Sequence, residues 1–588
     1  MKALTELAKR RGFFFQSSEP YGGVAGFYTY GPHGAALKAN VEERWRERFT
    51  VREGHTEIDA PTIMPEAVFE ASGHLDTFDD MLVECAGCAE SHRADHLIED
   101  ATDIEEAESL PIQEVESLIR AHDIACPTCG EPLAGEPVES FNLMFETSIG
   151  PGSGDRGYLR PETAQGIFVD FPRLKEYARG DLPFGVTQIG RAYRNEISPR
   201  NAVVRTREFT QAELEHFVRP EGDGPDLESV ADVEAPLYSA EMQADEDGGP
   251  VTMRIGEAVE AGVIADPWIA YYLGVARNWY ERIGVDMDRF RFRQHRAGEL
   301  AHYSSDCWDA EGDVSAPDEA PEWIELAGFS YRSDYDLSKH AEHSEERFTV
   351  FEEYDEPKTV ERATVDPDMA SLGPEFGGRA EDVADALDAL VDRDRTAFEG
   401  ETVTVEVDGE SIDVPVEKTG FSVDRVTETG RHVTPHVVEP SFGVDRAVFT
   451  VLVHAYEDDI VDGEERTVLR LPPSVSPTTV GVFPLMDKDG LGERAGSLAE
   501  DLRAAGFSVT YDDSGGIGRR YRRQDEIGTP FGVTVDYETL ETETVTLRDR
   551  DSTAQLRLPI DDLAGELASL RDGDRTFASL EADYPPAE

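Results

Sequence analysis

Lysine is scarce in this chain of 588 residues, and long apolar runs are absent from it. Only 8 of the 55 basic residues are lysines, and 122 acidic residues bring the formal net charge to −67 at pH 7. No stretch approaches the ~18 consecutive apolar residues of a membrane-spanning helix. The early apolar cluster Phe13–Phe15 is too short for a signal peptide. We therefore expect a cytoplasmic protein that does not enter a membrane.

The acidic residues are spread along the whole chain instead of forming a tail. Such a charge destabilises a compact state in dilute buffer, whereas at ~1 M salt the Debye length falls to about 3 Å and the repulsion is screened. We interpret the charge as adaptation to the molar-salt cytoplasm of a halophile. A surface for a basic partner would predict a localised acidic run, and none stands out. The hydrophobic fraction of 39% indicates several folded domains and argues against disorder.

Cysteine is also rare, but four of the five cysteines form two Cys-x-x-Cys pairs, Cys85–Cys88 and Cys126–Cys129. Two such pairs supply the four thiolates of a tetrahedral Zn²⁺ site, whereas a redox dithiol needs no second pair. Four sulfurs leave no open position on the metal, so we expect a structural zinc ion. The fifth, Cys307, is expected to be a buried packing residue.

Residues 186–217 predict a β-hairpin with a local excess of positive charge. Five arginines and one acid lie between Arg191 and Arg207. Strand alternation puts Arg205, Arg207, Phe209, Gln211 and Glu213 on one face. Guanidinium groups suit phosphate oxygens and an aromatic ring can stack on a base, so this hairpin predicts a nucleotide site.

Neither common phosphate loop accounts for that site. The letters GxGxxG occur at 152–157 but do not lead into a helix, and a GxxxxGK[ST] loop is absent. Two further segments carry similar polar chemistry: GYLRPETAQGIF, with Arg160 and Glu162, and HVVEPSFGVDRAVFTVL, with Glu439 and Ser441. In the latter, Arg446 falls in the first turn of a helix, where a cation opposes the helix dipole unless an anion binds nearby.

Composition divides the chain into parts. We expect a first part at 1–84, a zinc-binding insertion at 85–139 and a larger part at 140–470, which carries the nucleotide site predicted above and acid-rich, irregular insertions at about 220–250 and 345–430. Between the two cysteine pairs, residues 104–119 predict an acidic helix. The Pro-, Ser- and Thr-rich stretch 471–479 predicts a linker. Strands alternate with helices beyond it, which is typical of a small α/β domain at 475–588.

Together these segments resemble the three motifs of class II aminoacyl-tRNA synthetases, and specifically glycyl-tRNA synthetase of the archaeal and eukaryotic type. GPHGAALKANVEERW with Pro61 resembles motif 1, YRNEISPRNAVVRTREFTQAELEHF resembles motif 2, and EPSFGVDR resembles motif 3. LRPETAQGIF, ELAGFSYRSDYDL and the C-terminal domain match the family in the same order. The resemblance implies an α/β (α+β) fold, with an antiparallel sheet flanked by helices, a zinc-knuckle insertion and an anticodon-binding domain.

It also implies the chemistry: ATP-dependent attachment of glycine to tRNA(Gly) through a glycyl-adenylate, with Mg²⁺, in a homodimer built by motif 1. Implied as catalytic are Arg194, Glu196 and Arg446. Implied as ATP-binding are Arg194, Asn195, Glu196, Val204, Arg205, Thr206, Arg207, Glu208, Phe209, Glu325, Leu326, Gly443, Val444, Asp445 and Arg446. Implied as glycine-binding are Arg93, Glu162, Phe209, Thr210, Gln211, Ala212, Glu213, Arg332, Glu439, Pro440, Ser441, Phe442 and Gly443.

Within these sets the resemblance gives some residues particular roles. Arg194 is implied to hold the α-phosphate of ATP and the glycine carboxylate. Phe209 and Arg446 are implied to stack on the two faces of adenine, and Arg205 or Arg207 to reach the γ-phosphate.

Two alternatives remain at this stage. One is a non-catalytic synthetase-like dimer that binds nucleic acid, and the other is a class II synthetase for another small amino acid. In the C-terminal domain, four arginines at 519, 520, 522 and 523 surround Tyr521 and could contact tRNA bases. The alternative is a helix that supports the sheet, with its arginines paired to Asp525 and Glu526.

Overall fold

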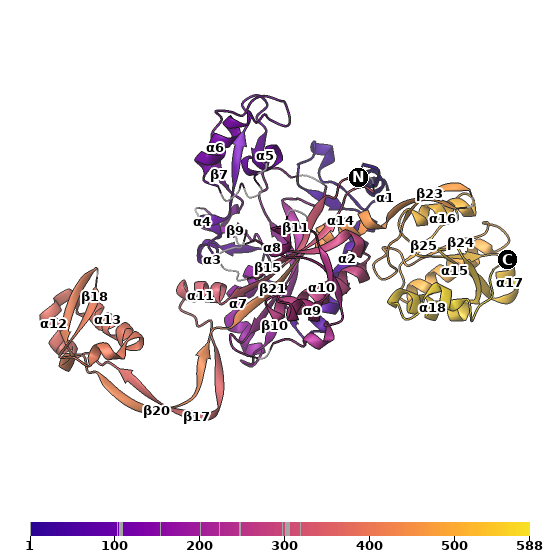
Figure 1. The fold of residues 1–588 in the computed structure, drawn as a ribbon. Coiled ribbons are helices and arrows are strands. Elements are labelled where there is room, and N and C mark those ends of the chain that lie inside the picture. The colour runs from indigo at the N-terminus through magenta and orange to yellow at the C-terminus, as the bar shows by residue number, and fades with distance from the viewer. Residues whose placement is uncertain are drawn as a thin grey trace. The chain divides into compact units, whose positions relative to one another are not determined.

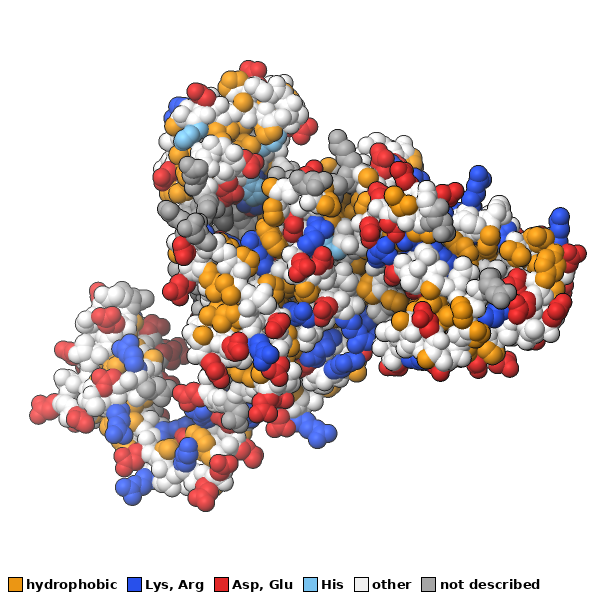
Figure 2. All heavy atoms as spheres, turned by 45° about the vertical axis from the view of Figure 1, so that its right-hand side comes forward, with side chains coloured by type: hydrophobic (Ala, Val, Ile, Leu, Met, Phe, Trp, Pro, Cys, Tyr) orange, Lys and Arg blue, Asp and Glu red, His pale blue; other side chains and the backbone are white. Residues whose placement is uncertain are grey.

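The computed structural model describes residues 2–587 apart from 103, 105, 106, 108, 109, 153, 200, 201, 223, 246, 247, 297, 300–305, 318, 408 and 462. The chain divides into two compact units, one made of Met1–Phe348 with Thr434–Glu588 and the other of Thr349–Val433. Acidic side chains are scattered over the face shown in Figure 2, as expected from the sequence. No helix in the described part of the chain combines the length and the apolar character that a bilayer crossing requires.

The centre of the first unit is a nine-stranded, mainly antiparallel sheet, which confirms the expected fold class (Figure 1). Only the pairs β10–β3 and β12–β14 are parallel. In spatial order the strands are β13 (Val251–Arg254), β12 (Glu234–Tyr238), β14 (Phe290–Gln294), β15 (Asp306–Asp313), β16 (Trp323–Ser333), β21 (His436–Gly443), β11 (Glu208–Val218), β10 (Phe184–Tyr193) and β3 (Thr56–Glu57). Strand β12 comes from the acid-rich segment 220–250, which the sequence suggested was irregular.

Helices α2 (Pro32–Trp45), α10 (Pro267–Ile283) and α14 (Val444–Ala455) pack on this sheet. Leu37, Val41, Trp45 and Phe49 recur at every fourth position along α2 and the helical turn after it, and all four are buried. The Phe49 ring lies 4.8 Å from the ring of Phe442 on β21. This aromatic core fixes one face of β21 against the helices, so that alternate residues of the strand face the other way.

The remaining elements of the first unit lie around the sheet. The helices are α1 (Lys2–Arg11), α3 (Glu66–Ala71), α4 (His74–Thr77), α7 (Ala164–Tyr177), α8 (Ala240–Gln243), α9 (Ile255–Glu260) and α11 (Tyr335–Glu342). The additional strands are β1 (Phe14–Gln16), β2 (Tyr28–Tyr30), β4 (Ile63–Pro65), β8 (Phe145–Ile149), β9 (Asp155–Leu159), β22 (Tyr456–Val461) and β23 (Glu464–Leu469).

The cysteine pairs belong to a small module with a hydrophobic core of its own. It consists of β5 (Asp79–Glu84), β6 (Ser91–Arg93), α5 (Ala94–Ala101), α6 (Ile112–Ala121) and β7 (Val138–Asn142). Of the helix predicted over 104–119, residues 105, 106, 108 and 109 lie outside the described part of the chain, and α6 itself begins after Pro111. Proline disfavours helical backbone in the residue before it, so the helix begins on its C-terminal side.

The C-terminal part is an α/β domain, as predicted, with the strand order β25-β24-β26-β27-β28. Its elements are β24 (Val480–Pro484), α15 (Leu491–Ala504), β25 (Val509–Tyr511), α16 (Ile517–Asp525), β26 (Phe531–Val535), α17 (Tyr537–Thr542), β27 (Thr544–Asp549), β28 (Gln555–Pro559), α18 (Ile560–Asp572) and α19 (Phe577–Leu580). Strands β25, β24 and β26 are parallel and the last two are antiparallel.

The second unit is a β-ribbon with a small globular end. The ribbon pairs β17 (Val350–Thr364) with β20 (Ser422–Val433). The end holds α12 (Met369–Phe376), α13 (Ala380–Arg393), β18 (Thr402–Val407) and β19 (Glu410–Pro415), around a hydrophobic core of its own.

Candidate active site

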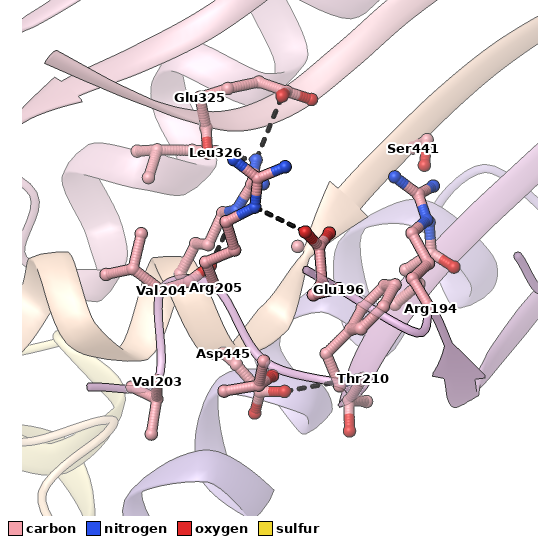
Figure 3. A pocket seen from close by; sticks show the side chains of 15 residues that line it. Arg194, Glu196, Val203, Val204, Arg205, Thr210, Glu325, Leu326, Ser441 and Asp445 are labelled. Atoms are coloured by element: carbon pink, nitrogen blue, oxygen red, sulfur yellow. Dashed lines mark hydrogen bonds and ion pairs between the residues drawn. The ribbon is translucent and has the colours of Figure 1, made fainter. Parts of the chain in front are cut away.

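A solvent-open cavity of about 600 Å³ lies where β11, β16 and β21 run side by side (Figure 3). Its walls come from the segments that resemble motifs 2 and 3 and from β16, which contributes Glu325 and Leu326. The lining residues are Arg194, Glu196, Val203, Val204, Arg205, Thr206, Phe209, Thr210, Gln211, Glu325, Leu326, Ser441, Gly443, Asp445 and Arg446. All but Val203 belong to the sets that the sequence pointed to.

Arg446 spans one end of the cavity. Its NH1 group donates to the carboxylate of Glu325 at 3.0 Å and to the Glu325 carbonyl at 2.9 Å, and its Nε donates to the Val204 carbonyl at 3.2 Å. The guanidinium therefore connects the first turn of α14 to β16 and to the loop after β10.

Arg205 and Arg194 supply two further cations. The Nε of Arg205 donates to Glu196 Oε2 at 2.6 Å. The guanidinium carbon of Arg194 lies 5.4 Å from the centres of the Phe78 and Phe209 rings, within the range of a cation–π contact. Thus three guanidinium groups and one aromatic ring border the same space (Figure 3).

Arg207 does not line this cavity. The prediction that its side chain shares a strand face with Phe209 and Gln211 is therefore wrong. Its guanidinium donates to the carbonyls of Glu196 at 3.1 Å and Ala25 at 2.9 Å. Strand β11 begins only at Glu208, so the period-two rule does not apply to Arg205 and Arg207. Of the two arginines, only Arg205 borders the cavity.

Other predicted residues also lie outside the lining. Arg93 pairs with Asp95 and, at 3.2 Å, with Asp80 in the cysteine module. The side chains of Ala212, Phe442 and Val444 lie in the hydrophobic core. Asn195, Glu208 and Pro440 are likewise absent from the cavity wall.

A cluster of buried carboxyl groups lies beside Ser441 and Gln211. Glu213 accepts hydrogen bonds from the Ser441 hydroxyl at 2.6 Å, from Gln211 Nε2 at 2.9 Å and from the backbone N–H of Ala164 at 2.6 Å. Glu162 accepts one from Gln165 at 2.8 Å and lies 3.6 Å from His74 Nε2.

Glu439 and Glu215 extend this cluster. Glu439 pairs with Arg332 NH1 at 2.8 Å, and the same arginine binds Asp336 through two further bonds of 2.7 and 2.8 Å. Neither carboxyl oxygen of Glu215 has a partner among the described residues. The sequence analysis missed Glu215, although the alternation of Gln211 and Glu213 reaches it one step later.

The crowding of these acids shifts their pKa values. Burial raises the pKa of Glu439 to about 8, with Arg332 opposing the shift and Glu213 and Glu162 adding to it. Burial also raises the pKa of Glu215 well above its usual range. For Glu162 burial opposes ionisation, but His74 outweighs it and lowers the pKa. The cluster thus has more acids than cations, and an added cation would relieve it.

A buried polar contact that the sequence analysis missed joins the three motif-like segments. Lys38 of α2 reaches Asp445 of α14 at 2.9 Å and the Thr210 hydroxyl of β11 at 2.5 Å. Asp445 also accepts the Thr210 N–H at 2.7 Å and the Tyr30 hydroxyl at 2.8 Å. Lys38 lies next to the apolar stripe of its helix, so no sequence pattern marks it as buried.

Arg160 has a structural role. It is buried, and its guanidinium donates to the carbonyls of Ala60 at 2.9 Å and Arg191 at 2.8 Å. A Cβ atom at Gly190 would lie 2.3 Å from this guanidinium, so the close approach requires glycine there. The contact joins β10 to the segment that carries Glu162.

The four paired cysteines converge as predicted. Their sulfur atoms all lie within 4.8 Å of one another. The separations are 3.6 Å for Cys85 and Cys129 and 3.7 Å for Cys88 and Cys126. Zn–S bonds of about 2.3 Å in a tetrahedron place sulfurs about 3.8 Å apart, so this donor set fits a zinc ion.

Comparison with known proteins agrees with this geometry. A family model described as "Anticodon binding domain" matches residues 479–570. The chain is 48% identical over 99% of its length to glycine–tRNA ligase of Methanothrix thermoacetophila, covering 98% of that protein. It is 48% identical to the enzyme of Methanothermobacter thermautotrophicus, with 96% and 98% coverage, and 47% identical to that of Archaeoglobus fulgidus, with 97% of each. The resemblance found in the motifs is thereby confirmed, and the chain belongs to the glycine–tRNA ligase family.

Proposed function

We propose that this chain activates glycine with ATP and transfers it to tRNA(Gly). The observation that supports this proposal most directly is that positively charged and acidic groups border the same cavity on different sides. One wall is formed by the guanidinium groups of Arg194, Arg205 and Arg446, and the other leads through Ser441 and Gln211 to buried acids. The first suits a triphosphate and the second an ammonium group.

ATP occupies the arginine side in this proposal. Arg446 and Phe209 enclose the adenine, and Arg194 faces the α-phosphate while Arg205 faces the γ-phosphate. Glu325 is half-exposed, which leaves its carboxylate accessible to the Mg²⁺ that ATP carries. That ion would neutralise phosphate charge when it is bound.

Glycine occupies the acidic side. Its ammonium group takes up part of the excess negative charge of Glu162, Glu213 and Glu439, and its carboxylate points to Arg194. Ser441 and Gln211 both donate hydrogen bonds to Glu213, and these bonds hold the Glu213 carboxylate in place. Asp336 holds the Arg332 guanidinium through two hydrogen bonds, and Arg332 in turn binds Glu439.

The reaction then requires that the two substrates be positioned correctly, and it needs no side-chain nucleophile. The glycine carboxylate oxygen attacks the α-phosphorus, the bond to the bridging oxygen of pyrophosphate breaks, and glycyl-adenylate forms. The guanidinium groups stabilise the charge that develops on the phosphates. The glycyl group subsequently passes to the terminal ribose of the tRNA, which releases AMP.

Other parts of the chain support the second step. The C-terminal domain is proposed to contact the anticodon, the four-cysteine module to hold a structural zinc ion, and α2 to form the homodimer. The enzyme is proposed to work in the cytoplasm. Among the described residues, the lining of the cavity includes none from these parts. Helix α2 is linked to the lining by Lys38, which binds Asp445 and Thr210.

ATP–pyrophosphate exchange with each of the twenty amino acids tests the proposal. Exchange should depend on glycine and be weak or absent with serine, threonine and proline. Exchange that prefers another small amino acid would support the alternative specificity. A folded protein without exchange for any amino acid would support a non-catalytic role.

A further inference from the structure

Strands β14 and β15 bring a histidine, a cysteine and an aspartate together outside the cavity described above. His295 directly follows β14, and Cys307 and Asp309 stand two residues apart on β15, so their side chains share a face. The backbone N–H of His295 donates to the carbonyl of Cys307 at 2.9 Å, which fixes the register. One nitrogen, one sulfur and one oxygen atom of these residues all lie within 4.8 Å of one another.

The surroundings of the three groups are confined and polar. The side chain of His295 is 24% exposed and that of Asp309 14% exposed, and Cys307 is 8% exposed. His295 Nε2 lies 2.8 Å from Asp309 Oδ2, and Cys307 Sγ lies 3.2 Å from the Ser330 hydroxyl. Cys307 is therefore buried, as expected from the sequence, but its sulfur faces polar groups instead of apolar packing.

We propose that His295, Cys307 and Asp309 bind a divalent cation of the zinc class, at a site separate from the four paired cysteines. One imidazole nitrogen, one thiolate and one carboxylate oxygen form a ligand set that suits Zn²⁺, Co²⁺ or Ni²⁺. Mg²⁺ and Ca²⁺ prefer oxygen ligands throughout, which a thiolate and an imidazole do not offer. Three protein ligands leave a coordination position for water.

Binding exchanges protons for the metal. The cation takes the place of the thiol proton of Cys307 and of the proton that His295 and Asp309 share, and both protons pass to solvent. Bonds of about 2.0–2.3 Å in a tetrahedron place ligand atoms ~3.3–3.8 Å apart, and the three atoms here lie within 4.8 Å of one another. The 2.8 Å contact between His295 and Asp309 would lengthen when the cation binds.

The position of this site gives the cation a further effect. On the same face of β15, Glu311 is paired in register with Glu325 of β16, which borders the ATP-side cavity and binds Arg446. Arg291 already pairs with Glu311 at 2.5 Å. A cation on Asp309 would add positive charge to this row of acids and tie the end of β14 to β15.

Metal content of the full-length protein tests the proposal. The protein is saturated with zinc, desalted and analysed for zinc per chain. The wild type should carry one equivalent more than Cys307→Ser and one more than His295→Gln. His343→Gln removes an exposed histidine at the end of α11 and should keep the wild-type content.

Cobalt provides a second measurement, which also guards against misfolding of a variant. Co²⁺ added to protein that carries a single zinc ion per chain, held by the paired cysteines, should produce a thiolate-to-metal charge-transfer band in the wild type that is absent from Cys307→Ser with an unchanged circular dichroism spectrum. Equal zinc content in the wild type and both variants would overturn the proposal. So would a cobalt band that persists in Cys307→Ser, because it would arise from the paired cysteines.

Discussion

At the scale of single residues, the acidic cluster determines how glycine affinity should depend on pH. Glu439 has a pKa of about 8, because burial and the neighbouring acids oppose its ionisation. An ammonium group favours the ionised form. The KM for glycine in pyrophosphate exchange should therefore fall as the pH rises from 6 to 8, and Glu439→Gln should lose this dependence. Parallel profiles for the two proteins would show that Glu439 does not face the ammonium.

The same pKa shift predicts that the stability of the fold falls as the pH rises, whereas the affinity for glycine increases. The folded chain holds a proton on Glu439 between the ordinary carboxyl pKa of ~4.3 and about 8, whereas the unfolded chain has lost it. The contribution of Glu439 to stability is fully present below pH ~4.3 and is lost as the pH rises through about 8. The Tm of the wild type should fall over this interval relative to that of Glu439→Gln, in thermal melts at constant molar salt. A constant difference between the two melting temperatures would argue against the raised pKa.

Ser441→Ala should weaken glycine binding more than ATP binding. The hydroxyl donates to Glu213 at 2.6 Å, and a hydrogen bond to a charged group is worth about 1.5–3 kcal/mol, which predicts a KM for glycine raised roughly 10- to 100-fold. The KM for ATP should change by less than threefold. Ser338→Ala on α11, whose hydroxyl bonds to Asp334 at 3.0 Å, is the matched control. Equal losses for both substrates would contradict the assignment.

Lys38→Met should destabilise the fold, because it leaves the buried Asp445 without its cation. Breaking a buried pair costs about 3–5 kcal/mol, measurable as a lower denaturant midpoint at constant salt. Lys9→Met is the control, since the Lys9 side chain is 61% exposed. If both variants unfold at the wild-type midpoint, the contact among α2, β11 and α14 contributes little.

These residues also show what the sequence could predict. Phe209 and Glu213 followed from the alternation of a strand, and Arg194 followed from the family resemblance. Lys38 and Asp445 are 407 positions apart, and no local pattern brings them together. Arg207 was misplaced because the strand begins one residue after it, where alternation has no meaning.

At the scale of single elements, helix α16 shows why a basic stretch is a weak guide to tRNA contacts. Arg520 is buried and donates to the carbonyls of Asp513 at 2.6 Å and Gly515 at 2.8 Å. The hydroxyl groups of Tyr521 and Thr534 form a hydrogen bond of 2.6 Å. Arg523 pairs with Asp512 through its Nε at 2.9 Å. Most of the stretch thus supports the sheet, as in the alternative considered from the sequence. The pairing differs from that alternative, because Arg520 and Arg523 bind Asp512, Asp513 and Gly515 instead of Asp525 and Glu526.

Arg519 differs, since its side chain is exposed on the same helix. Arg519→Ala should leave the melting temperature unchanged and slow tRNA charging, while exchange with glycine stays at the wild-type rate. Arg520→Ala should lower the melting temperature, because the carbonyls it binds lose their donor. Normal charging by Arg519→Ala would remove this residue from the tRNA surface.

At the scale of the whole molecule, the net charge of −67 predicts a strong response to salt. The Debye length grows from about 3 Å at 1 M to about 10 Å at 0.1 M, so repulsion among the acids increases as salt is diluted. The melting temperature and the exchange activity should both fall on transfer to 0.1 M KCl. Full stability at 0.1 M would contradict this prediction and show that repulsion among the acids contributes little to the stability of the fold.

Removing the C-terminal domain would also remove partners of a buried arginine outside that domain. The buried Arg466 of β23 pairs with Asp525 of α16 at 3.4 Å and donates to the Arg550 carbonyl at 2.8 Å. A chain ending near residue 474 would leave this guanidinium without those partners. Truncation should therefore be combined with replacement of Arg466 before loss of charging is assigned to the missing anticodon contacts.

The central claim is that one cavity holds ATP along its arginines and glycine against its carboxylates. A crystal structure with a non-hydrolysable glycyl-adenylate analogue tests this most directly. The account predicts the adenine between Phe209 and Arg446, and the ammonium group within hydrogen-bond distance of at least one carboxylate among Glu162, Glu213 and Glu439. An analogue whose amino group points to solvent, or whose adenine lies away from Phe209, would contradict it.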